Sequence, residues 1–347
     1  MTFLDATIEN GWGILTLNRR QALNALNFDM VRGFSTFLDR VESDVHIKGV
    51  LIQSARPQYF CVGGDIKDIY LNYQNDQNHI SQAYLEEEYA LNLKLANLSK
   101  PSIVLIDGLN LGGGVGISRY AKYRIITENA KIGMPEVKIA FFPDVGAGYF
   151  LNKLPTSAAR FLAITGSLVE GEDALTTGYG THYVESSSLS HLKKEILLGD
   201  IQNIETILKK HEAPASKSTF LKPNAKIIDF FNHDSLEEVI LKLAESQDPF
   251  AKELSTDLQE YSPLALKVIW MYMETTKNMP HAQVMELDKS LAKSFIEKSD
   301  FMEGIRTRII TKKDTPTWIY HFFAEISPAI LSDFFASASA STSKTLL

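Results

Sequence analysis

Two acidic residues and two glycine clusters have the residue types that chemistry at a carbonyl group requires. Glu136 occurs in Met-Pro-Glu and Asp144 in Phe-Phe-Pro-Asp, so both carboxyls have apolar neighbours in the sequence. Carboxyls in such surroundings are candidates for a shifted pKa and for catalysis. The glycines lie at positions 63–64 and 112–116, interrupted only at 115. There the backbone can approach a ligand closely and present its N–H groups.

Each glycine cluster follows a short apolar segment with the pattern of a strand. If these strands are neighbours, one N–H from each turn can converge on a single oxygen. Such a pair forms an oxyanion hole, in which one donor typically contributes about 10²–10³ in rate. The alternative is that both clusters are merely tight turns, and spacing alone leaves the two interpretations equally open.

Other motifs are incomplete. The second glycine cluster does not complete a dinucleotide fingerprint, because Ile117 or Arg119 takes the place of the third glycine. Ser118 lies in a partial nucleophile elbow that lacks its final glycine, so we predict an ordinary helix residue. The eight histidines show no metal-ligand spacing, and the single cysteine, Cys61, excludes an internal disulfide and a cysteine zinc cage. We expect no metal and no separate cofactor.

Composition limits the partners. The chain has 347 residues, 45% of them hydrophobic and 22% charged, with a net charge of −7. This acidic balance argues against a nucleic-acid surface, which needs a basic stripe. No apolar run approaches the roughly 18 residues of a membrane span. The start, MTFLDATIENGWG, lacks the pattern of a signal peptide, and with the single cysteine this predicts a cytoplasmic protein.

The elements predict an α/β class with a change of character along the chain. Apolar runs at 50–52, 103–106 and 123–127 predict buried strands, while helical periodicity dominates after about residue 185. We expect a catalytic core at 1–210, a helical C-terminal region at 211–335 and a disordered tail at 336–347. The polar runs at 72–79 and 213–226 predict an exposed loop and a linker.

Several segments resemble the crotonase superfamily: FCVGGDI at 60–66, DGLNLGGGVGIS at 107–118 and MPEVKIAFFPDVGAGYFL at 134–151. LNRRQALNAL at 17–26 supports the resemblance. The FPDVG piece, with SPLALK, MELDKSLA and DFMEGIRTRIITKKDTPTW further on, is similar to the 3-hydroxyisobutyryl-CoA hydrolase branch. The resemblance implies a crotonase-like spiral of ββα units with a helical C-terminal region. It also implies an acyl-CoA substrate, of which coenzyme A is part.

The resemblance also implies roles for individual residues. The family's oxyanion donors match the backbone N–H groups of Gly64 and Gly113, and its catalytic acids match Glu136 and Asp144. A substrate-contacting glutamate matches Glu88, for which an exposed acid or a helix cap is the competing interpretation. The positions matched to the coenzyme A arm are Ala22, Leu23, Ala25, Val62 and Ile66. Ala140 and Ala147 replace glycines of the branch, and both substitutions bear on the shape of the acyl pocket.

Hydration and hydrolysis place different demands on these positions. The family's hydratases carry a glutamate where this chain has Gly116, and they tend to have glycine where it has Asp144. This exchange disfavours hydration, because half of the acid–base machinery is absent. An isomerase stays open, and so does a non-catalytic acyl-CoA-binding protein.

The predicted function is hydrolysis of 3-hydroxyisobutyryl-CoA in valine catabolism. Glu136 either attacks the thioester directly or activates a water, and both routes stay open. The C-terminal helices are an expected homo-oligomer interface.

Overall fold

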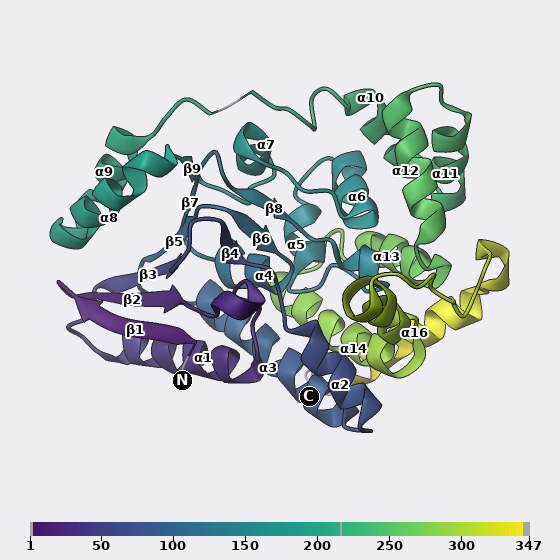
Figure 1. Ribbon diagram of the computed structural model, residues 1–347, viewed down its shortest axis with the longest axis horizontal. Coiled ribbons are helices and arrows are strands. Elements are labelled where there is room, and N and C mark those ends of the chain that lie inside the picture. The colour runs from purple at the N-terminus through teal and green to yellow at the C-terminus, as the bar shows by residue number, and fades with distance from the viewer. Residues whose placement is uncertain (1–2, 216, 343–347) are drawn as a thin grey trace. The chain divides into compact units, whose positions relative to one another are not determined.

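The computed structural model describes residues 3–215 and 217–342 (Figure 1), and the chain divides into two compact units. Unit 1 consists of Met1–Asp65, Glu87–Gly133 and Val169–Phe220. Unit 2 consists of Ile66–Glu86, Met134–Leu168 and Leu221–Leu347. The segments of the two units alternate along the chain, whereas the sequence predicts a linear division at residue 210. The linear division stays a prediction.

The main sheet of unit 1 has six strands in the order β1-β2-β3-β5-β7-β9. β1 and β2 form an antiparallel hairpin and the other neighbours are parallel. β3 and β5 are apolar because both of their faces are covered, as in most parallel sheets. The strand bounds are β1 Leu4–Glu9, β2 Trp12–Leu17, β3 Gly49–Ser54, β5 Ser102–Ile106, β7 Tyr123–Ile126 and β9 His182–Tyr183.

Alternation along β2 shows how this sheet is covered. A β-carbon on Gly13 would contact Phe37 and Val41 of helix α1 (Phe28–Ser43). The next residues on the opposite face, Trp12 and Ile14, belong to an apolar cluster with helices α8 (Leu189–Leu198) and α9 (Ile204–His211). Successive strand residues point to opposite faces, so α1 and the α8–α9 pair pack on different sides of the sheet.

A second, smaller parallel sheet carries both glycine turns. Its order is β4-β6-β8, with bounds Tyr59–Cys61, Leu109–Leu111 and Lys131–Gly133. The strands that the sequence predicts before the glycine clusters, at 50–52 and 103–106, are in β3 and β5, which are also neighbours. The sequence does not predict β4, β6 and β8, because three residues are too few to show a periodic pattern. Gly63 follows β4 and Gly112 follows β6, so the glycine turns leave neighbouring strands. The remaining helical elements of unit 1 are η1 Arg20–Ala22, α4 Gly113–Arg119, α7 Gly171–Thr176, η3 Ser186–Ser188, η4 Ile201–Asn203 and the part of α3 (Asn78–Ala96) from Glu87 onward.

The described part of unit 2 contains helices and no strands, as helical periodicity in the C-terminal region predicts. Its first segment holds α2 Ile66–Gln74 and the start of α3; its second holds η2 Glu136–Ile139, α5 Ala147–Leu151 and α6 Thr156–Thr165. Its third segment holds α10 Ala225–Ile228, η5 Asp229–Asn232, α11 Leu236–Glu245, α12 Pro249–Glu260, α13 Pro263–Thr275, α14 His281–Lys298, α15 Phe301–Ile305, η6 Arg306–Thr311, η7 Phe323–Glu325 and α16 Pro328–Thr342.

Two sequence predictions in this unit need correction. The polar run at 72–79 is not one long loop, because α2 continues to Gln74 and α3 begins at Asn78. The tail expected at 336–347 is helical as far as Thr342, where α16 ends, since its alanines favour helix. Positions 343–347 lie outside the described residues.

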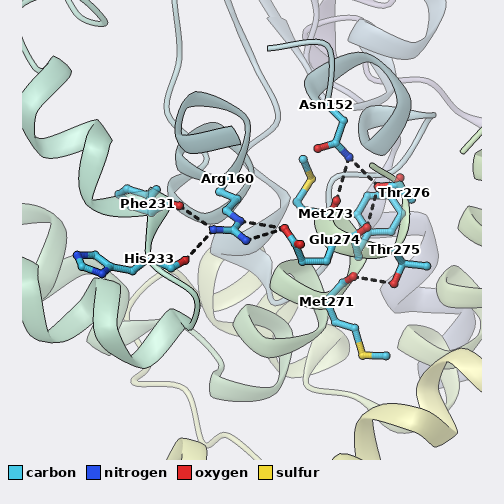
Figure 2. Close-up of polar contacts among 10 residues, drawn as sticks. Asn152, Arg160, Phe231, His233, Met271, Met273, Glu274, Thr275 and Thr276 are labelled. Carbon is cyan, nitrogen blue, oxygen red and sulfur yellow. Dashed lines mark hydrogen bonds and ion pairs between the residues drawn. The ribbon is translucent and has the colours of Figure 1, made fainter. Parts of the chain in front are cut away.

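Arg160 holds several segments of unit 2 together (Figure 2). Its guanidinium donates to Oε1 of Glu274 in α13 and to the main-chain oxygens of Phe231 and His233. It also lies over the ring of Trp270, 4.1 Å from the centroid. Because Arg160 is only 7% exposed, this pairing compensates the charge in a place that water barely reaches. α6 and α13 are thereby connected to the segment that precedes α11.

In the part of the chain that the structure describes, we find no helix long and apolar enough to cross a membrane.

Candidate active site

The first glycine turn is held in place by the N-terminal loop of unit 1. The N–H of Leu26 donates to the carbonyl of Gly63, and the N–H of Asp65 donates to the carbonyl of Leu26, both at 2.8 Å. Gly64 lies between these two bonds and its own amide takes part in neither. Asp65 also forms an ion pair with Arg19, with 2.5 Å between Oδ2 and Nη1. The loop therefore fixes the direction of the Gly64 amide.

The two glycine turns lie side by side. A β-carbon on Gly113 would lie 3.2 Å from the amide nitrogen of Gly64, and one on Gly63 would lie 3.5 Å from the amide nitrogen of Gly113. The N–H of Gly112 donates to the carbonyl of Gly133. The next residue, Gly113, is the first residue of α4. The first amides of a helix have no partner within the helix. Unit 1 therefore brings together the two amides predicted to act as oxyanion donors.

Glu88 lies against the same turn. The side chain comes from α3 and is 2% exposed, and its Oε1 atom would be 2.2 Å from a β-carbon on Gly113. The interpretation of Glu88 as an exposed acid or a helix cap is therefore wrong. Its neighbours Glu86 and Glu87 are not buried, and Glu87 pairs with Arg32 at the surface. Of the three consecutive glutamates on α3, Glu88 is the one whose helix face packs against the rest of unit 1.

Glu136 begins a tight turn in unit 2. It is the first residue of η2, half-buried, and the turn ends at Ala140 in the left-handed conformation with φ +54°. The amides of Ala140 and Phe141 donate to the carbonyls of Val137 and Glu136 and close the turn. Gly304 of α15 packs directly on its backbone, because a β-carbon there would lie 2.2 Å from the Ile139 carbonyl oxygen. The position of Glu136 depends on this close approach.

Asp144 lies in a strained loop of unit 2 and is 5% exposed. The next two residues, Val145 and Gly146, have φ values of +47° and +80°, and α5 begins at Ala147. Valine is uncommon in the left-handed region because its branched β-carbon crowds the backbone. Ala147 does not have a positive φ, so alanine replaces glycine there without backbone strain.

Two residues that hydrogen-bond to this segment, Asp288 and Tyr272, are not among the site residues predicted from the sequence. Asp288 of α14 accepts a hydrogen bond from the amide of Gly146, with 2.7 Å between N and Oδ2. The Tyr272 hydroxyl of α13 donates to Oδ1 of Asp288 at 2.7 Å and accepts from the amide of Gly148 at 3.0 Å. In the sequence, an aspartate on the apolar face of α14 indicates a buried polar contact, but the sequence does not indicate which residues this aspartate contacts.

The positions matched to the coenzyme A arm differ in exposure. Leu23 is 47% exposed with a left-handed backbone, Ala25 is buried, and Ala22, Val62 and Ile66 are half-buried. The contact of these positions with coenzyme A stays a prediction. Ile66 belongs to unit 2 and the other four to unit 1.

Ser118 and Cys61 are structural residues. The Ser118 hydroxyl is buried and donates to carbonyls within α4, which confirms the prediction of an ordinary helix residue. Cys61 is fully buried and its thiol donates to the carbonyl of Asn24 at 3.0 Å. Burial raises the pKa of this thiol to about 12, a hydrogen bond with Gly63 opposes the shift, and the charge of Glu88 adds to it.

A cavity of about 340 Å³ in unit 1 lies apart from these residues. Its lining comes from the loop after β3, the end of β5 and the start of α8, and none of the predicted site residues contributes to it. Within the described residues, no cluster of three or more histidine, cysteine or acidic side chains is suited to hold a metal ion.

Comparison with known proteins agrees with this fold and these motifs. A family model described as enoyl-CoA hydratase/isomerase matches residues 12–335. The chain therefore belongs to the enoyl-CoA hydratase/isomerase family, which confirms the resemblance to crotonases. Within that family, the chain is 33% identical over 333 residues to the mitochondrial 3-hydroxyisobutyryl-CoA hydrolase of Danio rerio, covering 94% of this chain and 87% of the relative.

Two solved structures share the fold over almost the whole chain. A carnitinyl-CoA dehydratase from Mycobacterium thermoresistibile superposes with a TM-score of 0.90 and 27% identity, covering 96% of both chains. An enoyl-CoA hydratase from Rhodobacter sphaeroides 2.4.1 gives a TM-score of 0.89 and 27% identity, covering 96% of this chain and 97% of the other. The predicted crotonase-like α/β class is confirmed.

Proposed function

We propose that this chain is a thioester hydrolase that converts 3-hydroxyisobutyryl-CoA and water to 3-hydroxyisobutyrate and coenzyme A, a step of valine catabolism. The observation that carries the proposal is the pair of adjacent amides of Gly64 and Gly113 next to the buried carboxyl of Glu88. Two neighbouring N–H groups suit the oxyanion that forms when a thioester carbonyl is attacked. The similarity to a relative named 3-hydroxyisobutyryl-CoA hydrolase supports this substrate.

The chemistry assigns each predicted residue a role. The Gly64 and Gly113 amides stabilise the negative charge on the carbonyl oxygen of the tetrahedral intermediate. Glu136 either takes a proton from the attacking water or attacks the carbonyl itself to form an anhydride that water then opens. The C–S bond breaks, and the thiolate leaves with little proton assistance because its conjugate acid has a pKa of about 8.5. Asp144 orients the substrate hydroxyl or the water, and Glu88 contacts the acyl group. No cofactor is needed besides the coenzyme A of the substrate.

A hydratase or isomerase is the second candidate, because the two solved structures compared above are of a dehydratase and a hydratase. Gly116 weighs against hydration in this chain. It lies buried within α4, at the position that the family resemblance matches to a hydratase glutamate, and it has no side chain. Hydration of a double bond would then lack the acid–base group that the family's hydratases carry at this position.

The test is thiol release from 3-hydroxyisobutyryl-CoA, measured beside hydration of crotonyl-CoA. We expect fast release and little hydration from the wild-type chain, with release lost in Glu136→Gln and Asp144→Asn. Glu286→Gln is the matched control, because this acid lies on the exposed face of α14 and pairs with Lys289. Strong hydration without release would replace the hydrolase with a hydratase. Binding of acyl-CoA without turnover would favour a non-catalytic binder. Homo-oligomer formation stays a prediction that sedimentation velocity tests.

A further inference from the structure

We propose that Asp288 and Tyr272 act as a positioning pair that holds the Asp144 loop in its active conformation. The proposal rests on the role of Asp144 in the proposed function, and it adds two residues to which no role is assigned above. Both side chains come from the C-terminal helices of unit 2, more than a hundred residues after the loop in the sequence.

The loop needs an external restraint. Val145 and Gly146 both have positive φ directly after Asp144, and Val145 is fully buried. A strained conformation of this kind persists only where the surrounding structure over-determines it. A main-chain hydrogen bond from Ala147 to the Asp144 carbonyl closes the turn from within. Neighbouring helices add restraint from outside the turn.

Asp288 and Tyr272 supply that restraint at two points. Asp288 accepts from the Gly146 amide, two residues after Asp144, and Tyr272 accepts from the Gly148 amide, two residues further along. The hydrogen bond between the two side chains joins these anchors into one unit. Both residues are 0% exposed, so water does not compete for the anchors.

Close packing of α5 on α13 leaves the loop little room to move. A β-carbon on Gly148 would lie 2.5 Å from the Thr276 hydroxyl oxygen, at the end of α13. A loop that is pressed against this helix and bonded to its Tyr272 has one well-defined position. A catalytic group that moves by about 1 Å can lose about 10² in rate. Loss of the anchors is therefore expected to lower kcat.

The electrostatic surroundings agree with an anchoring role. Burial raises the pKa of Asp288 well above its usual range, and bonds from Tyr272 and Gly146 oppose the shift. The charge of Asp144 raises it further. The hydrogen bonds from Gly146 and Tyr272 to the two carboxyl oxygens fix Asp288 between the loop and α13. An asparagine has the same shape and keeps an acceptor for Gly146, so it should replace Asp288 with little loss.

The experiment compares Asp288→Ala, Asp288→Asn and Tyr272→Phe with the exposed control Glu286→Gln. We expect Asp288→Ala to lower kcat for thiol release about 10- to 100-fold with KM changed less than about threefold, because Asp144 is displaced. Asp288→Asn keeps an acceptor for Gly146 and a partner for Tyr272, so we expect it to stay within about threefold of wild type in kcat. Tyr272→Phe removes one anchor and should fall between the two.

Hydrogen exchange of a peptide covering residues 143–150 provides a readout that needs no turnover. Faster exchange there in Asp288→Ala and Tyr272→Phe, but not in Glu286→Gln, supports the anchors even if the wild-type chain releases no thiol, an outcome that would count against the proposed function alone. Full kcat and unchanged exchange in Asp288→Ala would overturn the proposal. An equal loss in Asp288→Asn and Asp288→Ala would also overturn it, because the charge rather than the anchoring would then matter. If Asp288→Ala does not fold, the other two variants decide.

Discussion

Gly113 and Glu88 are so close that a methyl group on Gly113 would overlap the Glu88 carboxyl. The distance from the added carbon to Oε1 would be 2.2 Å, well inside van der Waals contact. The same carbon would lie 3.2 Å from the Gly64 amide nitrogen. A side chain at this position therefore disturbs both an oxyanion donor and the buried acid.

The first prediction concerns this contact. We expect Gly113→Ala to lower thiol release by about 10²–10³, the typical effect of losing one oxyanion donor. Release is measured by kcat/KM with 3-hydroxyisobutyryl-CoA. The control is Gly33→Ala in α1, an exposed glycine whose added carbon would contact the Leu4 side chain at 3.2 Å. Equal activity in Gly113→Ala and the control would remove Gly113 from the proposed oxyanion hole.

The second prediction concerns Ala140, which ends the turn that begins at Glu136. Its left-handed backbone costs about 1–2 kcal/mol for a residue other than glycine. Ala140→Gly removes this cost and so stabilises the fold. The stabilisation is offset by about 0.5–1 kcal/mol of backbone entropy and about 0.8 kcal/mol of lost methyl burial. We expect the free energy of unfolding to change by less than about 1 kcal/mol.

Valine at position 140 tests the opposite change, in which the side chain becomes larger and branched. Ala140 is fully buried, and a branched side chain with positive φ is strained as well as crowded. We expect Ala140→Val to lower the free energy of unfolding by at least about 2 kcal/mol, measured by chemical denaturation. An unchanged free energy of unfolding in Ala140→Val would show that the turn does not hold residue 140 firmly in the left-handed conformation.

The third prediction concerns Cys61, whose thiol has a pKa of about 12 because it is buried. An ordinary cysteine thiol has a pKa of about 8.5, so at pH 8 the thiolate fraction in the folded chain is about 10³-fold smaller. We expect Ellman's reagent to label the native protein at least about 10³-fold more slowly than the unfolded chain. The reagent then reports released coenzyme A with little background. Fast labelling of the native protein would contradict the burial of this cysteine.

The fourth prediction concerns the pH dependence of stability at Asp288. Its pKa in the folded chain is raised by burial, while in the unfolded chain it is about 4. Between these values the folded state binds a proton that the unfolded state has lost, so the free energy of unfolding falls as pH rises. Below about pH 4 the contribution of Asp288 is fully present, and it is lost as pH rises through the raised pKa.

Asp288→Asn removes this titration and leaves the other groups in place. We therefore expect the melting temperature of Asp288→Asn, relative to wild type, to increase from pH 5 to pH 7. Glu286→Gln on the exposed face of the same helix should show no such trend. A pH-independent difference between Asp288→Asn and wild type would mean that Asp288 titrates alike in the folded and unfolded chains.

Local sequence is sufficient to predict the glycine turns and the family to which the chain belongs, and it indicates Glu136 and Asp144 as candidate acids, whose roles stay predictions. Glycine clusters, a proline before an acid and helical periodicity all depend on residues that are adjacent in the chain. The three-residue strands β4, β6 and β8 leave no such pattern, and their pairing is what brings Gly64 and Gly113 together.

Tertiary structure decides the burial of Glu88 and the anchoring of the Asp144 loop. Three consecutive glutamates offer no local reason to prefer Glu88, and only the packing of α3 places that carboxyl against Gly113. Asp288 and Tyr272 reach the loop from helices far along the chain. Hydrogen bonds and burial between distant segments depend on how helices pack, and neighbouring residues in the sequence do not determine that packing.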